Sequence, residues 1–146
     1  MAARTFLCFD YGLKRIGVAV GQELTGTASA LTTVTARDGK PDWPAITRLF
    51  EAWQPDAVVV GLPLNMDGTD HELSRRVRRF GNQLHGRYNL PTHFIDERLS
   101  SLEAESRLKG GLRQKKHPKK DDIDKLSAKV ILETWLAESP PQPQDA

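Results

Sequence analysis

The chain has 146 residues, of which 38% are hydrophobic and 27% charged, and its formal net charge is +2. This length fits one domain, and this composition excludes a disordered or membrane protein. No apolar run approaches the roughly 20 residues of a membrane-spanning helix, and no signal peptide is recognisable. A cytoplasmic location is therefore expected, in agreement with the single cysteine, Cys8, which cannot form an internal disulfide.

The N-terminal part of the chain predicts antiparallel strands. Residues Thr5–Asp10 and Arg15–Gly21 predict a hairpin joined by the turn Tyr11–Lys14. The stretch Ala28–Thr35 is rich in β-branched residues and predicts a third strand. A turn cluster, Asp38–Pro41, follows it.

The middle of the chain alternates helices with buried strands. Apolar residues at helical spacing over 43–53 predict a helix that stops before Pro55. The continuous apolar run 57–60 is typical of a strand buried on both faces in parallel pairing. The apolar stripe over 73–84 predicts a second helix with its arginines facing outward, and 92–95 predicts one more strand.

The C-terminal part predicts helices separated by a loop. Residues 100–103 have capping-box spacing and predict a short helix, and 109–122 lack periodicity and predict a mobile loop. A last helix is expected from about Ile123 to Leu136. We expect one domain over 1–138 and a disordered tail over 139–146. The order of elements predicts an α/β fold with a five-stranded mixed sheet, three antiparallel strands then two parallel, flanked by helices.

Acidic residues end or follow two of the predicted strands. Asp10 ends the first strand, and Glu97 closely follows the strand 92–95. Ligand chemistry in open α/β sheets gathers at the carboxyl ends of strands. If these strands are parallel neighbours, the two acids meet at one edge of the sheet.

A third acid can come from the aspartates at the start of the last helix. The helical period aligns Asp124 with Ala128 and Ile131, so Asp124 is expected to face the sheet. Asp122 aligns with the polar stripe and is expected to cap the helix or face solvent. Asp122 nevertheless remains the alternative third acid.

Three carboxylates at one edge repel one another unless a proton or a cation neutralises them. Mg²⁺ and Mn²⁺ take oxygen ligands, and two such ions can clamp the attacking and leaving oxygens of a phosphodiester. No His/Cys cluster has the spacing of a zinc site. Asp10, Glu97 and Asp124 are therefore the predicted catalytic residues and metal ligands. The alternative is that each acid serves only a turn, an ion pair or a helix cap.

Basic residues near these acids are candidates for binding a phosphate backbone. They include Lys14 and Arg15 in the first turn and Arg98 beside Glu97. We also expect contacts from Asn65, in the loop 61–68, and from the basic loop after residue 109. The basic loop supplies Arg113, Lys115, Lys116, Lys119 and Lys120. Arginines also crowd residues 75–87. The alternative for either cluster is a solvated face.

Three segments in order, DYGLKRIGVA at 10–19, GLPLNMDG at 61–68 and DERLS at 96–100, resemble the YqgF/RuvX family. The resemblance implies an RNase H-like fold and a bacterial nuclease that processes the 5′ end of precursor 16S rRNA. It also implies that Asp10, Glu97 and Asp124 are the acidic site residues, and it leaves ribosome-assembly factors as candidate partners. Leu126 departs from the family, which has a small residue there, so the last helix is expected to sit slightly further from the sheet.

Two other functions remain open from the sequence. One is cleavage of four-way DNA junctions, because an older family label is Holliday-junction resolvase-like. The other is a non-catalytic RNase H-like module that binds nucleic acid during ribosome assembly or transcription. The preference for RNA over DNA depends on the resemblance alone, and the oligomeric state is left open.

Overall fold

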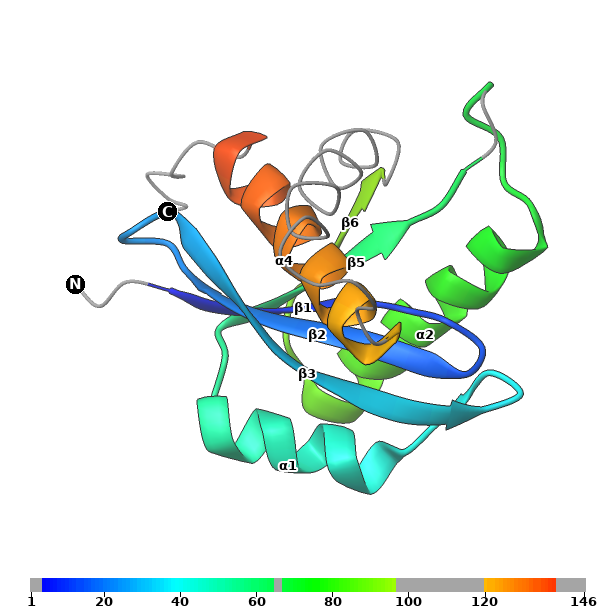
Figure 1. The fold of residues 1–146 in the computed structure, drawn as a ribbon, viewed down its shortest axis with the longest axis horizontal. Helices are drawn as coiled ribbons and strands as arrows, with labels where there is room; N and C mark the ends of the chain where they lie inside the picture. The colour runs from blue at the N-terminus through cyan, green and yellow to red at the C-terminus, as the bar shows by residue number, and fades with distance from the viewer. Residues whose placement is uncertain (1–3, 65–66, 97–119, 139–146) are drawn as a thin grey trace.

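The computed structural model describes residues 4–64, 67–96 and 120–138. It consists of a mixed sheet with helices on both faces (Figure 1). The strands are β1 (Thr5–Asp10), β2 (Arg15–Gln22), β3 (Thr27–Arg37), β4 (Lys40–Pro41), β5 (Ala57–Leu62) and β6 (Thr92–Asp96). The helices are α1 (Trp43–Trp53), α2 (Glu72–Tyr88) and α4 (Lys120–Glu138). Among the described residues, no helix is both long and apolar enough to cross a membrane.

The sheet has the order β4-β3-β2-β1-β5-β6. Strands β1, β2 and β3 are antiparallel neighbours, whereas β5 and β6 continue the sheet parallel to β1. The predicted mixed sheet is therefore confirmed, with one addition. The sixth strand, β4, lies in the predicted turn cluster and pairs with β3 through only two residues, so it has no alternating pattern to reveal it.

The three parallel strands end at one edge of the sheet. Phe9 of β1 pairs with Val60 of β5, and Leu62 of β5 pairs with Asp96 of β6. Asp10 and Asp96 therefore both stand at the carboxyl edge. This is the edge where α/β sheets place their ligands.

One face of the sheet packs an aromatic core against α1 and α2. The Phe80 ring of α2 lies 5.7 Å from the Phe9 ring and 4.9 Å from the Tyr11 ring, measured between centroids. The Phe50 ring of α1 stacks on Tyr88 at 3.9 Å. We call this side the aromatic face.

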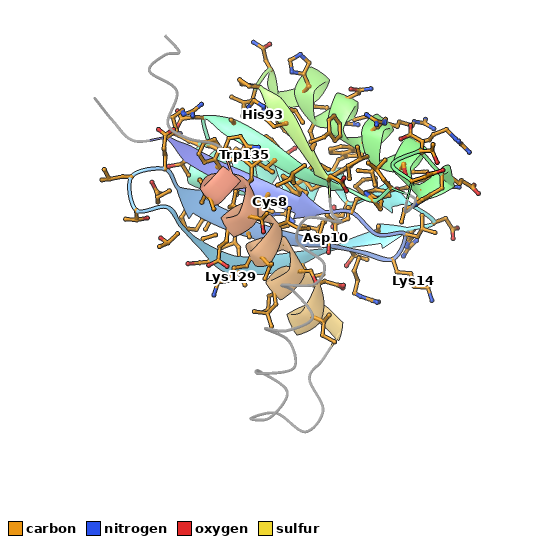
Figure 2. The ribbon with its side chains drawn as sticks, turned by 90° about the horizontal axis from the view of Figure 1, so that it is seen from above. Cys8, Asp10, Lys14, His93, Lys129 and Trp135 are labelled. Atoms are coloured by element: carbon orange, nitrogen blue, oxygen red, sulfur yellow. The ribbon has the colours of Figure 1, made fainter. Side chains whose placement is uncertain are left out.

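The other face packs small residues under α4 (Figure 2), and we call it the α4 face. Ala19 and Ala28 of the sheet are buried here with Ala128 of the helix. A Cβ added at Gly21 would lie 2.7 Å from Leu132 Cδ2, and one at Gly17 would collide with the carbonyl of Asp124. Glycine is thus required at position 17, because the backbone of the helix lies directly on the strand there, whereas the nearest atom to Gly21 belongs to a leucine side chain.

Candidate active site

Asp10 lies at the carboxyl end of β1, on the α4 face. Alternate residues of a strand point to the same face, and Asp10 follows Phe6 and Cys8, which are both buried in the core beneath α4. Figure 2 shows Cys8 and Asp10 along the helix. The neighbouring Tyr11 is buried instead in the aromatic core.

Asp124 reaches the same place from the first turns of α4. Gly17 pairs with Asp10 in the β1–β2 ladder, and the missing side chain of Gly17 admits the backbone of Asp124. Gly17 is therefore next to both acidic residues: Asp10 is its partner in the neighbouring strand, and Asp124 lies above it in the helix. The expected inward direction of this helix face is confirmed, because Ala128 and Ile131 are buried against the sheet.

Arg15, the first residue of β2, forms an ion pair with Asp124. The Arg15 Nε atom donates to Asp124 Oδ2 over 2.8 Å. The two side chains are 32% and 28% exposed, so the pair lies at the surface rather than in the core. From the sequence, Arg15 is expected to contact a phosphate. The ion pair with Asp124 joins residues 109 positions apart, so no local pattern reveals it.

The turn between β1 and β2 is held in place by β3 and the β3–β4 turn. The amide of Ala36 donates to the carbonyl of Lys14, and the amide of Gly39 donates to the carbonyl of Leu13, both over 2.9 Å. The Lys14 side chain is exposed beside this edge. Figure 2 shows it extending away from the sheet.

The last strand brings a further acid, Asp96, which the sequence analysis did not select. It ends β6 and pairs with Leu62. Its neighbour Ile95 is buried in the core beneath α4, and Glu97 lies two positions after Ile95, outside the described residues. Within the part of the chain that is described, no group of three or more His, Cys, Asp or Glu residues is arranged to hold a metal ion.

Several predicted residues and elements lie outside the described residues. The predicted helix beginning at Ser100, most of the basic loop and the tail 139–146 are among them. So are the site residues Glu97, Asn65, Arg98, Arg113, Lys115, Lys116 and Lys119. Lys120 is the first residue of α4, and neither its side chain nor that of Asp122 is described.

The expectation for Leu126 is wrong. Its side chain is 37% exposed, so it points away from the sheet and cannot hold the helix at a distance. The close contact between Gly17 and the Asp124 backbone shows that α4 lies tightly on β2.

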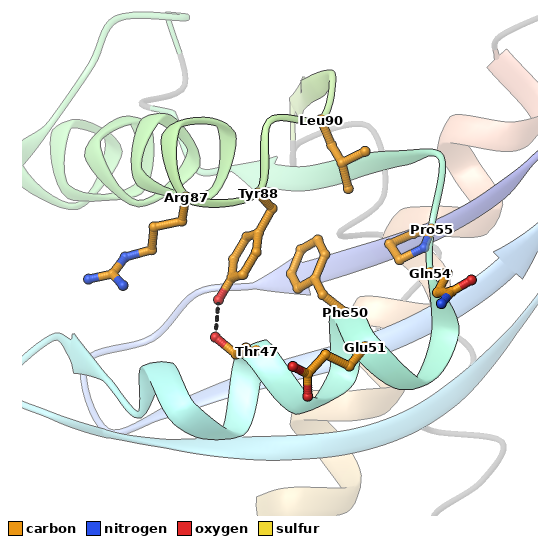
Figure 3. Close-up of a pocket in the computed structure, with 8 residues that line it drawn as sticks. All are labelled: Thr47, Phe50, Glu51, Gln54, Pro55, Arg87, Tyr88 and Leu90. Atoms are coloured by element: carbon orange, nitrogen blue, oxygen red, sulfur yellow. Dashed lines mark hydrogen bonds between the residues drawn. The ribbon is translucent and has the colours of Figure 1, made fainter.

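One cavity is remote from these acids. Its volume is about 560 Å³, and it lies between the ends of α1 and α2 (Figure 3). Pro55 and Leu90, which line it, precede β5 and β6, so the cavity is at the amino ends of the parallel strands. Inside it, the Thr47 and Tyr88 hydroxyls are hydrogen-bonded over 2.9 Å. None of the described residues that line this cavity lies at the carboxyl edge of the sheet.

The family model described as "RuvX: Holliday junction resolvase" matches residues 4–138. A protein of Saccharophagus degradans is 48% identical over 143 residues, which are 98% of this chain and 100% of that protein. A protein of Yersinia enterocolitica is 54% identical over 140 residues, 94% of this chain and 98% of its own length. Both are named "Putative pre-16S rRNA nuclease".

Two solved structures share the fold at low sequence identity. Thermus thermophilus RuvC bound to a Holliday junction substrate has a TM-score of 0.56 at 15% identity, covering 92% of this chain and 96% of RuvC. The yeast mitochondrial Holliday junction resolvase Ydc2 has a TM-score of 0.54 at 11% identity, and the match covers 90% of this chain and 77% of the Ydc2 chain. The expected RNase H-like fold is thus confirmed. With a family model spanning nearly all of its residues and full-length relatives at about half identity, the chain belongs to the RuvX family.

Proposed function

We propose that this protein is a divalent-metal-dependent nuclease of the bacterial cytoplasm that hydrolyses phosphodiester bonds in precursor 16S rRNA. The observation that carries the proposal is that Asp10 and Asp124 both lie next to Gly17 on one face of the sheet. Asp10 pairs with Gly17 in the ladder, and the backbone of Asp124 packs against it. The names of the relatives supply the reaction and the substrate.

The donor set fits Mg²⁺ or Mn²⁺. Asp10 and Asp124 offer carboxylate oxygens at the carboxyl edge, and both are partly exposed, so a hydrated ion and a phosphate have access. Glu97 completes the set in this proposal. When bound, a pair of such ions activates a water molecule and stabilises the leaving oxygen of a phosphodiester.

The surrounding residues position these acids and hold the substrate. The ion pair with Arg15 fixes the Asp124 carboxylate at the edge. Lys14 presents its ammonium group to a phosphate from a turn whose carbonyls are hydrogen-bonded to the β3 side of the sheet. We also propose Arg15, Asn65, Arg98 and the basic residues of the loop after 109 as substrate contacts.

A second candidate function is cleavage of four-way DNA junctions. It is favoured by the description of the family as a Holliday junction resolvase. Full-length relatives at about half identity carry the RNA assignment, so we rank rRNA processing first.

The test is cleavage by the wild type and by Asp10→Asn. The substrates are a 5′ fragment of precursor 16S rRNA, single-stranded DNA and a four-way junction, each with Mg²⁺, Mn²⁺ or EDTA. We expect metal-dependent cutting of the RNA that Asp10→Asn abolishes, because an amide lacks the charge that holds a cation. The matched control is Asp42→Asn, where the side chain caps α1 and Asn caps equally well.

The outcomes separate the candidates. Cutting of the junction but not of the RNA would support the resolvase. Tight RNA binding by the wild type without cutting of any substrate would support a non-catalytic module. An Asp10→Asn protein that cuts at the normal rate would remove Asp10 from the site, provided that thermal unfolding shows both proteins folded.

A further inference from the structure

A second cavity opens on the aromatic face, directly behind the proposed active site. Its volume is about 340 Å³, and it lies between the β3–β4 turn and one flank of α2. The side chains that matter here are Tyr11, Lys40, Trp43, Arg76, Arg79 and Gln83. Helical spacing places Arg76, Arg79 and Gln83 in one row along α2, because they are three and four positions apart.

The cavity is positively charged. Lys40, Arg76 and Arg79 line it, and Asp38 is the acidic residue among the lining side chains. Arg76 has a weak partner in Glu72, at 3.7 Å and largely exposed. Arg79 forms no salt bridge with any described residue, and its side chain is exposed. The guanidinium of Arg79 is therefore available to an anion.

The cavity is also a formed structure and not only a charged surface. The Tyr11 hydroxyl donates to the Gly39 carbonyl over 2.5 Å. Gly39 has a φ of +83°, and a Cβ there would lie 2.7 Å from the Tyr11 hydroxyl and 3.0 Å from Arg76 Nη1. Burial raises the pKa of Tyr11, while the charges of Arg76 and Arg79 act in the opposite direction. The Tyr11 hydroxyl thus stays protonated and remains a hydrogen-bond donor to Gly39.

Tyr11 connects this cavity to the proposed active site. It follows Asp10 in the chain, and the two side chains point to opposite faces at the same edge. Among the described residues, the β1–β2 turn lies at this edge and carries the exposed Lys14.

We propose that this cavity is a second substrate site that binds a backbone phosphate of the nucleic-acid strand outside the cleaved bond. The inference rests on the proposed nuclease function and extends it to how the strand is held. The Trp43 ring already packs against Phe80, at 5.8 Å, and under the Arg87 guanidinium, at 4.0 Å. Recognition therefore uses charge rather than base stacking, so it positions the strand without reading its sequence.

The test compares Arg79→Gln with Arg75→Gln. Both arginines are exposed on α2 and lack salt bridges with described residues, but Arg75 does not line the cavity. Each variant loses the same charge from the same helix. The probe is a fluorescently labelled single-stranded RNA of about 20 nucleotides, with binding measured by anisotropy in EDTA over a series of salt concentrations.

We expect Arg79→Gln to weaken RNA binding about fivefold to tenfold and to reduce the salt slope by about one, as loss of one phosphate contact does. Arg75→Gln should change the affinity less than about twofold. In cleavage assays Arg79→Gln should raise KM and leave kcat unchanged, because the contact is made equally in the ground and transition states. Lys40→Gln should act in the same direction as Arg79→Gln.

Equal losses in Arg79→Gln and Arg75→Gln would overturn the inference, since a general charge effect would then explain both. Its failure is distinct from failure of the proposed function. A wild type that cleaves RNA while Arg79→Gln binds normally refutes only the second site. A wild type that cleaves nothing, but binds RNA more tightly than Arg79→Gln, refutes only the nuclease.

Discussion

The two faces of the sheet differ in how β2 contacts the helices that cover them. The aromatic face fills the space under two helices with large rings, such as Phe9, Phe50 and Phe80. On the α4 face Phe6 and Leu132 are also buried, but β2 presents Gly17, Ala19 and Gly21 to the helix, so that α4 lies directly on this strand. Large rings stabilise the fold through the apolar area that they bury, whereas small residues determine how closely a helix approaches the sheet. Asp10 and Asp124 lie on the face where the small residues of β2 fix the distance between the helix and the strand.

The largest expected effect tests the aromatic face as the source of stability. Leu84 is fully buried there, and Leu84→Ala should lower the free energy of unfolding by about 2–5 kcal/mol, because it leaves a cavity. Leu24→Ala is the matched control, since Leu24 is 82% exposed and its truncation should cost less than about 0.5 kcal/mol. Urea unfolding measures both. Similar losses would mean that burial on this face does not dominate stability.

The next effect tests the α4 face as a spacer. Gly17→Ala places a methyl group against the Asp124 carbonyl, so it should cost about 1–3 kcal/mol and also reduce cleavage by moving Asp124. Gly86→Ala is the control, because a Cβ there meets nothing within 4 Å and alanine should stabilise α2 by about 0.5–1 kcal/mol. Full cleavage activity in Gly17→Ala would show that the close contact between α4 and β2 does not position Asp124.

A smaller effect is expected for the ion pair between Arg15 and Asp124. A double-mutant cycle with Arg15→Gln and Asp124→Asn should give a coupling of about 0.2–1 kcal/mol, because both groups are partly exposed and screened. The coupling should fall as salt is raised. Chemical unfolding of the four proteins provides the measurement. A coupling that is larger and insensitive to salt would show that this pair is desolvated.

The smallest effect concerns His93, which lies on the α4 face beside Trp135 (Figure 2) at 5.3 Å between rings. Burial, with a further contribution from Arg4, lowers the pKa of His93 from 6.5. The unfolded chain therefore binds the proton more readily than the folded one. Stability should be fully present above the unfolded value of 6.5 and decline as the pH falls through the lower folded pKa.

Thermal unfolding between about pH 7 and pH 5 measures this dependence. His93→Gln should flatten the curve in that window, because glutamine does not titrate. A curve equally steep in the variant would assign the dependence to other groups.

Much of the fold follows from local pattern. The apolar run at 57–60 predicts the buried parallel strand β5, and the spacing from Trp43 to Trp53 predicts α1. Each pattern arises because residues close together in the sequence are buried in the same element, so a short segment of sequence is enough to predict it. The predicted last helix, 123–136, was found with longer ends, over Lys120–Glu138, because polar end turns lack an apolar stripe.

The candidate site could be predicted only in part. The direction of Asp124 follows from helical period, but its partner Arg15 comes from a distant strand, and no local pattern encodes that contact. A signal for the close helix was present in the alternation of Gly17, Ala19 and Gly21, which leaves one face of β2 without bulk. Glu97 lies outside the described residues and stays a prediction.

The separation of 109 positions between Arg15 and Asp124 also has a consequence for synthesis of the chain. The hairpin that carries Asp10 and Gly17 leaves the ribosome before α4, which is the last described helix along the chain. A nascent chain therefore displays Asp10 long before Asp124 can lie on Gly17. In the proposed function, the acidic site is complete only after α4 has been synthesised.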